Sequence, residues 1–428
     1  MKKLLLAFSL VSASLVQAQV GVEKLDSIEM GATYLNDVYY LLKDGSTKIE
    51  ATNNWHMAFQ TGGQTDGLRI NSATASGANN GSVSIYVYPN GAASDWATMD
   101  TTGYDSWMSL DNSDESWSIG ALNTTAGQFP DFGWGVYNMT THIVTGDSIY
   151  LMKYTVGGMD QFKKLYIAKK ENSNWFFKYA DVDGSNEQNA ELKSSDYKGK
   201  NFIYYNFESN SALDREPAAW DFVLTRYAAL QTNGVYFPST GILTNTGVLA
   251  AKAEGKAVAD LALADTTIGF IGTMNIIGYD WKYYEFGGQG VTWHTSDSLA
   301  YFIQDRDKVL WKVVFTSFGG SANGKTVFNK TQLTPATAIR NAEAALTQTA
   351  LYPNPSAGIS QLVLSANQTS DAIIRVLDLN GKVVAEMNET IQAGIQTVTL
   401  DLNGLNAGVY FVQVNAAGFQ SSQKLIKY

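Results

Sequence analysis

Apolar and polar residues alternate along most of this chain, in short runs bounded by turn-forming residues. Runs such as 82–88 and 175–179 place every second side chain on one face, which is typical of strands buried on one side. A helical composition is limited to 248–264, rich in Ala, Leu, Lys and Glu, and to 336–346. The pattern therefore predicts an all-β protein made of antiparallel sheets, with 336–346 in a linker.

Two tyrosines followed fifteen residues later by a tryptophan occur twice in the chain. The two sets are Tyr39, Tyr40 and Trp55, and Tyr204, Tyr205 and Trp220. Later landmarks keep their order, since 133–137 matches 278–282 and 147–151 matches 297–301. This repetition predicts two similar tandem antiparallel domains, 20–194 and 195–333. One large sandwich with two related halves is the alternative.

The last residues, 351–428, carry a separate series of strand-like runs. Alternating apolar positions mark the runs 373–379, 398–402 and 409–414. Asn380-Gly381 is a signal for a tight hairpin turn. We therefore expect a small antiparallel β-sandwich here, joined to the preceding domains by a linker at 334–350.

Several motifs follow one another in this terminal segment. They are YPNP at 352–355, LDLNGKVV at 377–384, LNAGVYFVQV at 405–414 and QKLIK at 423–427. Together they resemble the type A C-terminal sorting domain of type IX secretion system cargo proteins. The resemblance implies that the secretion machinery recognises 351–428, that the protein crosses an outer membrane, and that the domain is removed afterwards.

The N-terminus predicts the same route. Lys2 and Lys3 precede an apolar run, 4–16, and Val16-Gln17-Ala18 is a small-residue cleavage pattern, so 1–19 is predicted to be a secretory signal peptide. The run is shorter than the roughly twenty apolar residues of a spanning helix. No later stretch is long and apolar enough to span a membrane. We expect an extracellular protein without a membrane span, released or held at the outer-membrane surface.

Charge and composition narrow the possible functions. The net charge of −10 argues against nucleic acid or an anionic membrane as a partner, because both attract a basic surface. The absence of cysteine excludes disulfides, thiolate metal sites and a cysteine nucleophile. With 3 histidines, no Gly-x-Ser-x-Gly elbow and no His-Glu-x-x-His motif, we expect a non-enzymatic protein.

Three further patterns suggest chemistry less directly. Residues 319–326 match the phosphate-loop pattern, but a strand composition follows where a helix is required, so a hairpin turn is expected. Residues 181–187 offer oxygen ligands for calcium without the twelve-residue loop, and a solvated turn is the simpler interpretation. Asp111, Asp114 and Glu115 lie between two tryptophans and would suit a sugar-cleaving cleft only if they converge. A secreted hydrolase is thus a third class of function.

Two histidines occupy similar places in the repeat. His142 precedes 147–151 and His294 precedes 297–301, and in the repeat register they differ by two positions, which keeps both side chains on one face of a strand. A neutral imidazole there could ligate a metal or a haem iron, with a methionine as the second ligand. The methionine candidates are Met139, Met152 and Met159. The simpler interpretation is a hydrogen-bonded histidine at a strand edge.

A second resemblance covers roughly residues 35–333. The order of WDF at 220–222, GWGVYN with a following TH at 133–142, and GDSIYLMKY at 146–154 is similar to that of HmuY-like secreted haem-binding proteins. This resemblance implies all-β domains that hold haem in a cleft between two axial His or Met side chains. It points to His142 with Met139 or Met152 in the first domain, and to His294 in the second.

The combined expectation is a secreted, non-enzymatic protein that binds haem or a related tetrapyrrole at the cell surface and passes it to an outer-membrane transporter. The alternative is a surface adhesin, or a glycan- or protein-binding module without a haem site. Paired His and Met side chains facing one pocket would favour haem. A continuous exposed strip of aromatic side chains would favour a glycan.

Overall fold

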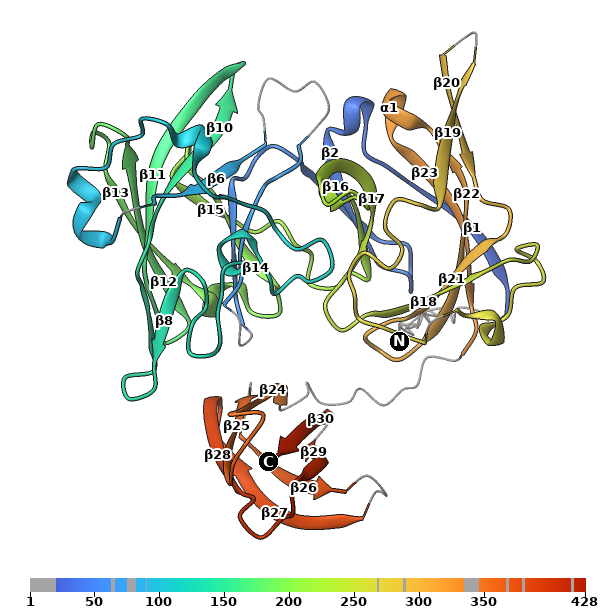
Figure 1. Ribbon diagram of the computed structural model, residues 1–428. Coiled ribbons are helices and arrows are strands. Elements are labelled where there is room, and N and C mark those ends of the chain that lie inside the picture. Colours follow the sequence, from blue (N-terminus) through green and yellow to red (C-terminus); the bar gives the residue numbers. More distant parts are fainter. Residues whose placement is uncertain are drawn as a thin grey trace, which may run out of the picture.

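The chain forms two large β-sandwiches and a smaller third one that contains the C-terminus (Figure 1). The computed structural model describes residues 21–62, 66–74, 82–89, 91–267, 269–287, 290–334, 346–366, 369–378, 382–416 and 419–428. Within these ranges nearly all regular structure is antiparallel strand, so the predicted all-β class is confirmed. The predicted signal peptide, 1–19, lies outside the described residues.

Sandwich 1, residues 52–215, packs an eight-stranded sheet against a four-stranded sheet. The larger sheet has the order β13-β12-β11-β10-β6-β7, with β9 paired to β11 and β8 to β9, and the smaller has the order β15-β14-β4-β5. Its strands are β4 (Met57–Gln60), β5 (Leu68–Ile70), β6 (Ser84–Val87), β7 (Ser109–Leu110), β8 (Gly135–Asn138), β9 (Ile143–Gly146), β10 (Ile149–Val156), β11 (Met159–Glu171), β12 (Asn174–Asp181), β13 (Gln188–Lys193), β14 (Phe202–Asn206) and β15 (Ser211–Leu213). Its 3-10 helices are η2 (Ala93–Ala97), η3 (Tyr104–Ser106), η4 (Ala121–Asn123) and η5 (Ser194–Tyr197). Phe59, Trp134 and Trp175 lie in the core between the sheets.

Sandwich 2 combines residues 23–51 with 216–334. A five-stranded sheet, β1-β23-β22-β21-β18, faces a four-stranded sheet, β17-β16-β2-β3, and the hairpin β19-β20 projects from it (Figure 1). Its strands are β1 (Glu23–Glu29), β2 (Asn36–Tyr40), β3 (Thr47–Ala51), β16 (Phe222–Leu230), β17 (Tyr236–Thr244), β18 (Leu249–Glu254), β19 (Lys282–Gly287), β20 (Gly290–Thr295), β21 (Leu299–Gln304), β22 (Leu310–Phe318) and β23 (Lys325–Gln332). Its helices are η1 (Ala32–Tyr34), η6 (Leu263–Asp265) and α1 (Gly320–Asn323). Tyr40, Phe222 and Trp281 lie in its core.

The C-terminal sandwich, residues 346–428, has a core of its own. A three-stranded sheet, β24-β25-β28, packs against a four-stranded sheet, β27-β26-β29-β30. The strands are β24 (Leu346–Tyr352), β25 (Ile359–Ala366), β26 (Ser370–Leu377), β27 (Val383–Ile391), β28 (Gly394–Asp401), β29 (Gly408–Ala416) and β30 (Phe419–Lys427). Because its buried cluster contains only its own residues, this unit can fold by itself.

The repeat appears in the structure as an exchange of strands. In the register of β2 with β16, Tyr40 lies opposite Phe222, and in that of β14 with β4, Tyr205 lies opposite Met57. Tyr205 lies 165 residues after Tyr40, and Phe222 lies 165 residues after Met57, so the two pairs are equivalent. The first strands of each repeat therefore pair with the tryptophan strand of the other repeat.

This exchange divides the chain differently from the predicted ranges 20–194 and 195–333. Strands β1 to β3 close sandwich 2, where β1 pairs with β23, whereas β14 and β15 close sandwich 1. The repeated residues could not reveal the exchange, because Tyr39-Tyr40 and Tyr204-Tyr205 offer the same side chains to either tryptophan strand.

The helix predicted at 248–264 is wrong. Residues 249–254 form β18, which pairs with β21, and the rest is turn with the short helix η6. Ala250 faces the main core of sandwich 2 and Ala253 faces a second apolar cluster on the other side of the sheet. The small side chains fit a strand buried on both faces, which outweighs the helix propensity of alanine. Of the other predicted helical stretch, 336–345 lies outside the described residues and Leu346 begins β24.

The short helix α1 and strand β23 occupy the region that matches the phosphate-loop pattern. The helix has four residues and β23 follows at once, so β22 and β23 form the expected hairpin. Among the residues that the structure describes, no helix is long and apolar enough to cross a membrane.

Candidate functional site

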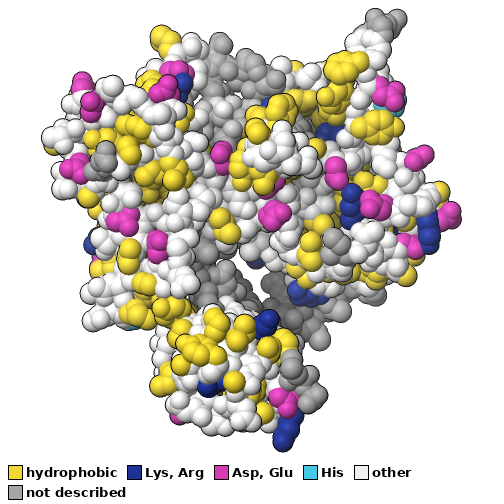
Figure 2. Space-filling view, viewed as in Figure 1, with side chains coloured by type: hydrophobic (Ala, Val, Ile, Leu, Met, Phe, Trp, Pro, Cys, Tyr) yellow, Lys and Arg dark blue, Asp and Glu magenta, His cyan; other side chains and the backbone are white. Residues whose placement is uncertain are grey.

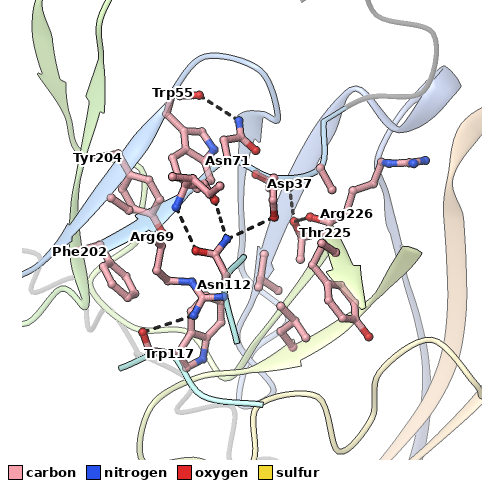
Figure 3. Close-up of a pocket in the computed structure, with 18 of the residues that line it drawn as sticks. Asp37, Trp55, Arg69, Asn71, Asn112, Trp117, Phe202, Tyr204, Thr225 and Arg226 are labelled. Atoms are coloured by element: carbon pink, nitrogen blue, oxygen red, sulfur yellow. Dashed lines mark hydrogen bonds between the residues drawn. The ribbon is translucent and has the colours of Figure 1, made fainter. Parts of the chain in front are cut away.

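The four-stranded sheets of the two sandwiches face each other, and a small pocket lies between them (Figure 3). Trp117 packs against Phe202 of sandwich 1 and Trp220 of sandwich 2, and its Nε1 donates to the carbonyl of Thr244 at 2.7 Å. The cavity is about 70 Å³. Drug-sized ligands occupy cavities of roughly 300–1,000 Å³, so this pocket is too small for a tetrapyrrole.

A buried arginine fixes the sandwich 1 side of this interface. Arg69 donates to the backbone carbonyls of Ser113, Ser116 and Ile119, and burial lowers its pKa to about 10. These contacts fix the segment that carries Trp117 against β5. We therefore assign Arg69 a structural role.

The structure does not bring the candidate carboxylates Asp111, Asp114 and Glu115 together. Asp114 lines the pocket and accepts hydrogen bonds from the backbone N–H of Leu230 at 3.0 Å and from Asn275 Nδ2 at 3.2 Å. Burial raises the pKa of Asp111, which is not among the residues lining the pocket. Glu115 uses its carbonyl to accept from the N–H of Met274. Asp114 therefore links the sandwiches, and the three groups do not share one cleft.

The predicted calcium ligands are engaged with one another. Asp181 forms an ion pair with Lys163 at 2.5 Å and accepts from Asn186 Nδ2 at 2.6 Å. The hydrogen-bonded contact with Lys163, followed by that with Asn186, holds its pKa below the ordinary value. Within the described residues no group of three or more carboxylate or imidazole side chains is placed to hold a metal ion.

His142 lies in the turn between β8 and β9, with its side chain exposed. Its Nδ1 is 2.7 Å from the hydroxyl of Tyr137. Met139, in the same turn, is 53% exposed. These two candidates are therefore close along the chain and open to solvent.

Met152 and His294 lie elsewhere. Met152 is fully buried in the core of sandwich 1, where β10 pairs with β6, so it does not join His142 in the turn. His294 is on β20 of sandwich 2, stacked on Tyr283 with ring centroids 5.3 Å apart. The structure thus does not bring His142, His294, Met139 and Met152 into one pocket. Met159 is exposed at the end of the β10-β11 hairpin.

The two histidines nevertheless occupy equivalent hairpins. β8-β9 and β19-β20 each follow a fully buried tryptophan, Trp134 in sandwich 1 and Trp281 in sandwich 2. Each histidine contacts a tyrosine of the preceding strand, Tyr137 or Tyr283. Both copies therefore present a histidine beside a tyrosine of the corresponding hairpin, His142 in the turn and His294 within strand β20.

A larger cavity adjoins the first of these pairs. It has a volume of about 420 Å³ and is lined on sandwich 1 by Phe129, Phe132 and Tyr137, which we call the aromatic wall. Ring centroids in the wall lie 5.8 Å apart for Phe129 and Tyr137 and 6.4 Å for Phe132 and Tyr137. The opposite side is formed by residues of the C-terminal sandwich, among them Tyr352 and Pro355. Sequence reasoning missed this site because its two sides lie more than two hundred residues apart.

The hairpin β19-β20 carries an exposed apolar face. Tyr284 lies opposite Trp293 and Phe286 opposite Val291, so these four side chains share one face of the ribbon, which we call the aromatic ribbon. Phe286 is 80% exposed, and the rings of Tyr284 and Trp293 lie 5.3 Å apart. Figure 2 shows apolar side chains along this projecting hairpin. The alternation of aromatic residues from 281 to 294 is a signal that could have predicted it.

Comparisons with known proteins identify the last part of the chain. Residues 350–428 match the family model described as a secretion system C-terminal sorting domain. No curated protein matches the chain. Among solved structures, dimeric latent PorU from Porphyromonas gingivalis aligns over 95% of this chain and 34% of its own, with 9% identity and a TM-score of 0.18. The chain thus spans about a third of the length of PorU, and nothing about its body follows from so weak a likeness. The C-terminal sandwich is a type IX sorting domain, and the protein is cargo of that system, secreted or attached at the cell surface.

Proposed function

We propose that the exported protein binds haem in sandwich 1, beside the aromatic wall. The observation that carries the proposal is the aromatic wall on sandwich 1, because it includes Tyr137, the residue that is hydrogen-bonded to His142. The predicted resemblance to haem-binding domains and the predicted role of His142 both favour this place.

The chemistry of the wall suits a flat apolar ligand. Small-molecule sites combine aromatic lining with a few placed polar groups. Phe129 and Tyr137 offer ring surface for the macrocycle. Tyr137 also brings a hydroxyl group that can orient a ligand.

His142 is the group that would hold the iron. In the tautomer in which Nδ1–H donates to the Tyr137 oxygen, Nε2 carries the lone pair that a metal requires. Met139 lies three residues earlier in the same exposed turn and is the candidate second ligand. The bound haem would supply the iron and the absorbing macrocycle. Delivery to an outer-membrane haem transporter would follow release from this open turn.

The test is a haem titration of residues 20–334 followed by visible spectroscopy. We expect a shifted Soret band with a dissociation constant raised at least tenfold by His142→Ala. Met139→Leu should convert a six-coordinate spectrum into a five-coordinate one if the thioether is a ligand. His294→Ala is the matched control, because it removes the equivalent imidazole of sandwich 2. A spectrum no different from that of free haem would contradict the proposal, and equal binding by the His142 variant would move the site elsewhere.

The aromatic ribbon favours a second function, binding of a neutral extracellular glycan. Tyr284, Phe286 and Val291 are exposed on this face, beside the half-buried ring of Trp293. Flat rings can stack on the apolar faces of sugars, and exposed apolar patches often mark binding sites. We expect the double variant Tyr284→Ser with Phe286→Ser to lose retention on immobilised polysaccharides, whereas Phe237→Ser, a change at another exposed aromatic residue on β17, should keep it. Equal retention of both variants would exclude the ribbon.

A further inference from the structure

The turn at the start of the sorting domain faces the aromatic wall of sandwich 1. The rings of Tyr352 and Phe129 lie 6.4 Å apart at an angle of 62°. Pro353, Asn354 and Pro355 also line the cavity behind this contact. Aromatic pairs favour such edge-on arrangements at this separation. The contact therefore has the geometry of a specific interaction between two folded units.

Hydrogen bonds within the sorting domain hold this turn in place. Asn354 Nδ2 donates to the carbonyl of Lys424 at 2.7 Å, and Asn354 Oδ1 accepts from the N–H of Ile426 at 2.9 Å. Ser360 Oγ donates to the carbonyl of Pro353 at 3.0 Å. Because the turn is anchored to β25 and β30, Tyr352 and Pro355 form a preorganised surface. Preorganisation lowers the conformational cost of docking.

We propose that the sorting domain docks on sandwich 1 through Tyr352 and Phe129 and covers the aromatic wall until the domain is removed. The occupant of this apolar surface is thus the YPNP turn of the same chain. The docking itself is independent of any ligand. Its consequence for haem rests on the function proposed above: the site stays closed during export and opens when the sorting domain leaves.

The absence of cysteine from the chain provides a direct test by cross-linking. Gln128→Cys and Pro355→Cys place one thiol on each side of the cavity and leave the aromatic contact intact. In the full chain, a short bifunctional maleimide should join this pair at least tenfold faster than the control pair Met159→Cys with Pro355→Cys. Met159 is an exposed residue of the same sandwich, outside the cavity. Equal rates for the two pairs would overturn the proposal.

A third substitution tests the residues that make the contact. Phe129→Ala in the Gln128–Pro355 cysteine background should slow cross-linking several-fold, while Phe237→Ala should leave it unchanged. A thermal melt of each variant verifies that the sandwiches remain folded. If Phe129→Ala alters folding, Tyr352→Ala makes the same test from the other side, since Tyr352 is 41% exposed and lies outside the core of its domain. No slowing in a folded variant would overturn the assignment of the contact.

Haem binding distinguishes the two proposals. If both hold, residues 20–334 bind haem at least tenfold more tightly than the full chain, and Tyr352→Ala in the full chain reduces the difference. If cross-linking succeeds and neither form binds haem, docking stands and the haem site fails. If both forms bind equally and cross-linking is no faster than the control, haem binding stands and the docking fails.

Discussion

Tyr39 and Tyr204, which are separated by 165 residues in the chain, place their hydroxyl oxygens 3.4 Å apart. They are the same position of the two repeats, so this contact lies on a local twofold axis between the sandwiches. The axis also relates two edge-on ring pairs, Trp55 with Tyr204 at 5.0 Å and Tyr39 with Trp220 at 5.1 Å. The residues that reveal the repeat in the sequence thus form the contact between the two sandwiches.

Removing the hydroxyl of Tyr204 should lower the free energy of unfolding more than removing that of Tyr39. Tyr204 also donates to Glu216 Oε1 at 3.2 Å, so Tyr204→Phe leaves two buried groups without this partner, whereas Tyr39→Phe affects one. An unsatisfied buried group costs about 1–3 kcal/mol. We expect Tyr204→Phe to lower the free energy of unfolding by about 2 kcal/mol and Tyr39→Phe by about 1 kcal/mol, measured by urea denaturation. A larger loss for Tyr39→Phe would contradict this arrangement.

The sequence predicted strands, the repeat and the sorting domain from local patterns, because alternation and turn residues act over a few positions. It could not predict which repeat each tyrosine strand would join, since both tryptophan strands offer an equivalent edge. The strand at Ala250 was mistaken for a helix because its burial on both faces depends on residues elsewhere in the chain. For the same reason His142 could be proposed from its position, while its contact with Tyr137 and the cavity beside it required the fold.

Stability should decrease as the pH rises from about 5 to 7. Burial raises the pKa of Glu216 and of Asp221 to about 7, well above the values of exposed carboxyl groups. In this window the folded state keeps protons that the unfolded state has released, so the free energy of unfolding falls with increasing pH. Each group contributes about 2 kcal/mol to the decrease across this window.

Glu216→Gln and Asp221→Asn should each flatten part of that decrease. Urea denaturation at pH 5, 6, 7 and 8 measures the slope. The double variant should gain stability as the pH rises, because burial lowers the pKa of His56 to about 4 and that of Lys282 to about 7, so the unfolded state then binds more protons than the folded state. Asp95→Asn, a change at an exposed helix start, is the control and should keep the slope of the natural protein. A wild-type curve that rises from pH 5 to pH 7 would refute the burial of neutral carboxyl groups.

The strand exchange predicts which fragment of the chain folds alone. Residues 52–215 contain all strands of sandwich 1, so this fragment should be monomeric and unfold cooperatively. Residues 20–194 lack β14 and β15, which leaves an edge of β4 unpaired, and they carry β1 without its partner β23 and β2 without its partner β16. Unpaired strand edges promote aggregation. Size-exclusion chromatography of the two fragments decides between these boundaries, and a soluble, cooperative 20–194 fragment would exclude the exchange.

Arg215 lies where the chain passes from sandwich 1 to sandwich 2. We expect its substitution to be the most destabilising change at the contact between the sandwiches. Its Nη2 forms an ion pair with Asp37 at 2.6 Å, and its Nη1 donates to the carbonyl of Ala51 at 2.7 Å and contacts Asn54. It therefore joins the end of β15 in sandwich 1 to β2 and β3 in sandwich 2.

Removing Arg215 leaves the Asp37 carboxylate buried without its cation. Burial already raises the pKa of Asp37 in spite of the arginine, and the loss of one partner from a buried ion pair costs about 3–5 kcal/mol. Arg215→Met should lower the free energy of unfolding by that amount at pH 7, and Asp37→Asn in the same chain should restore part of it. The matched control is Arg375→Met, which breaks an exposed ion pair with Glu386 and should cost less than about 1 kcal/mol. Equal losses in the free energy of unfolding for the two arginine variants would show that the contact between the sandwiches does not depend on the ion pair of Arg215.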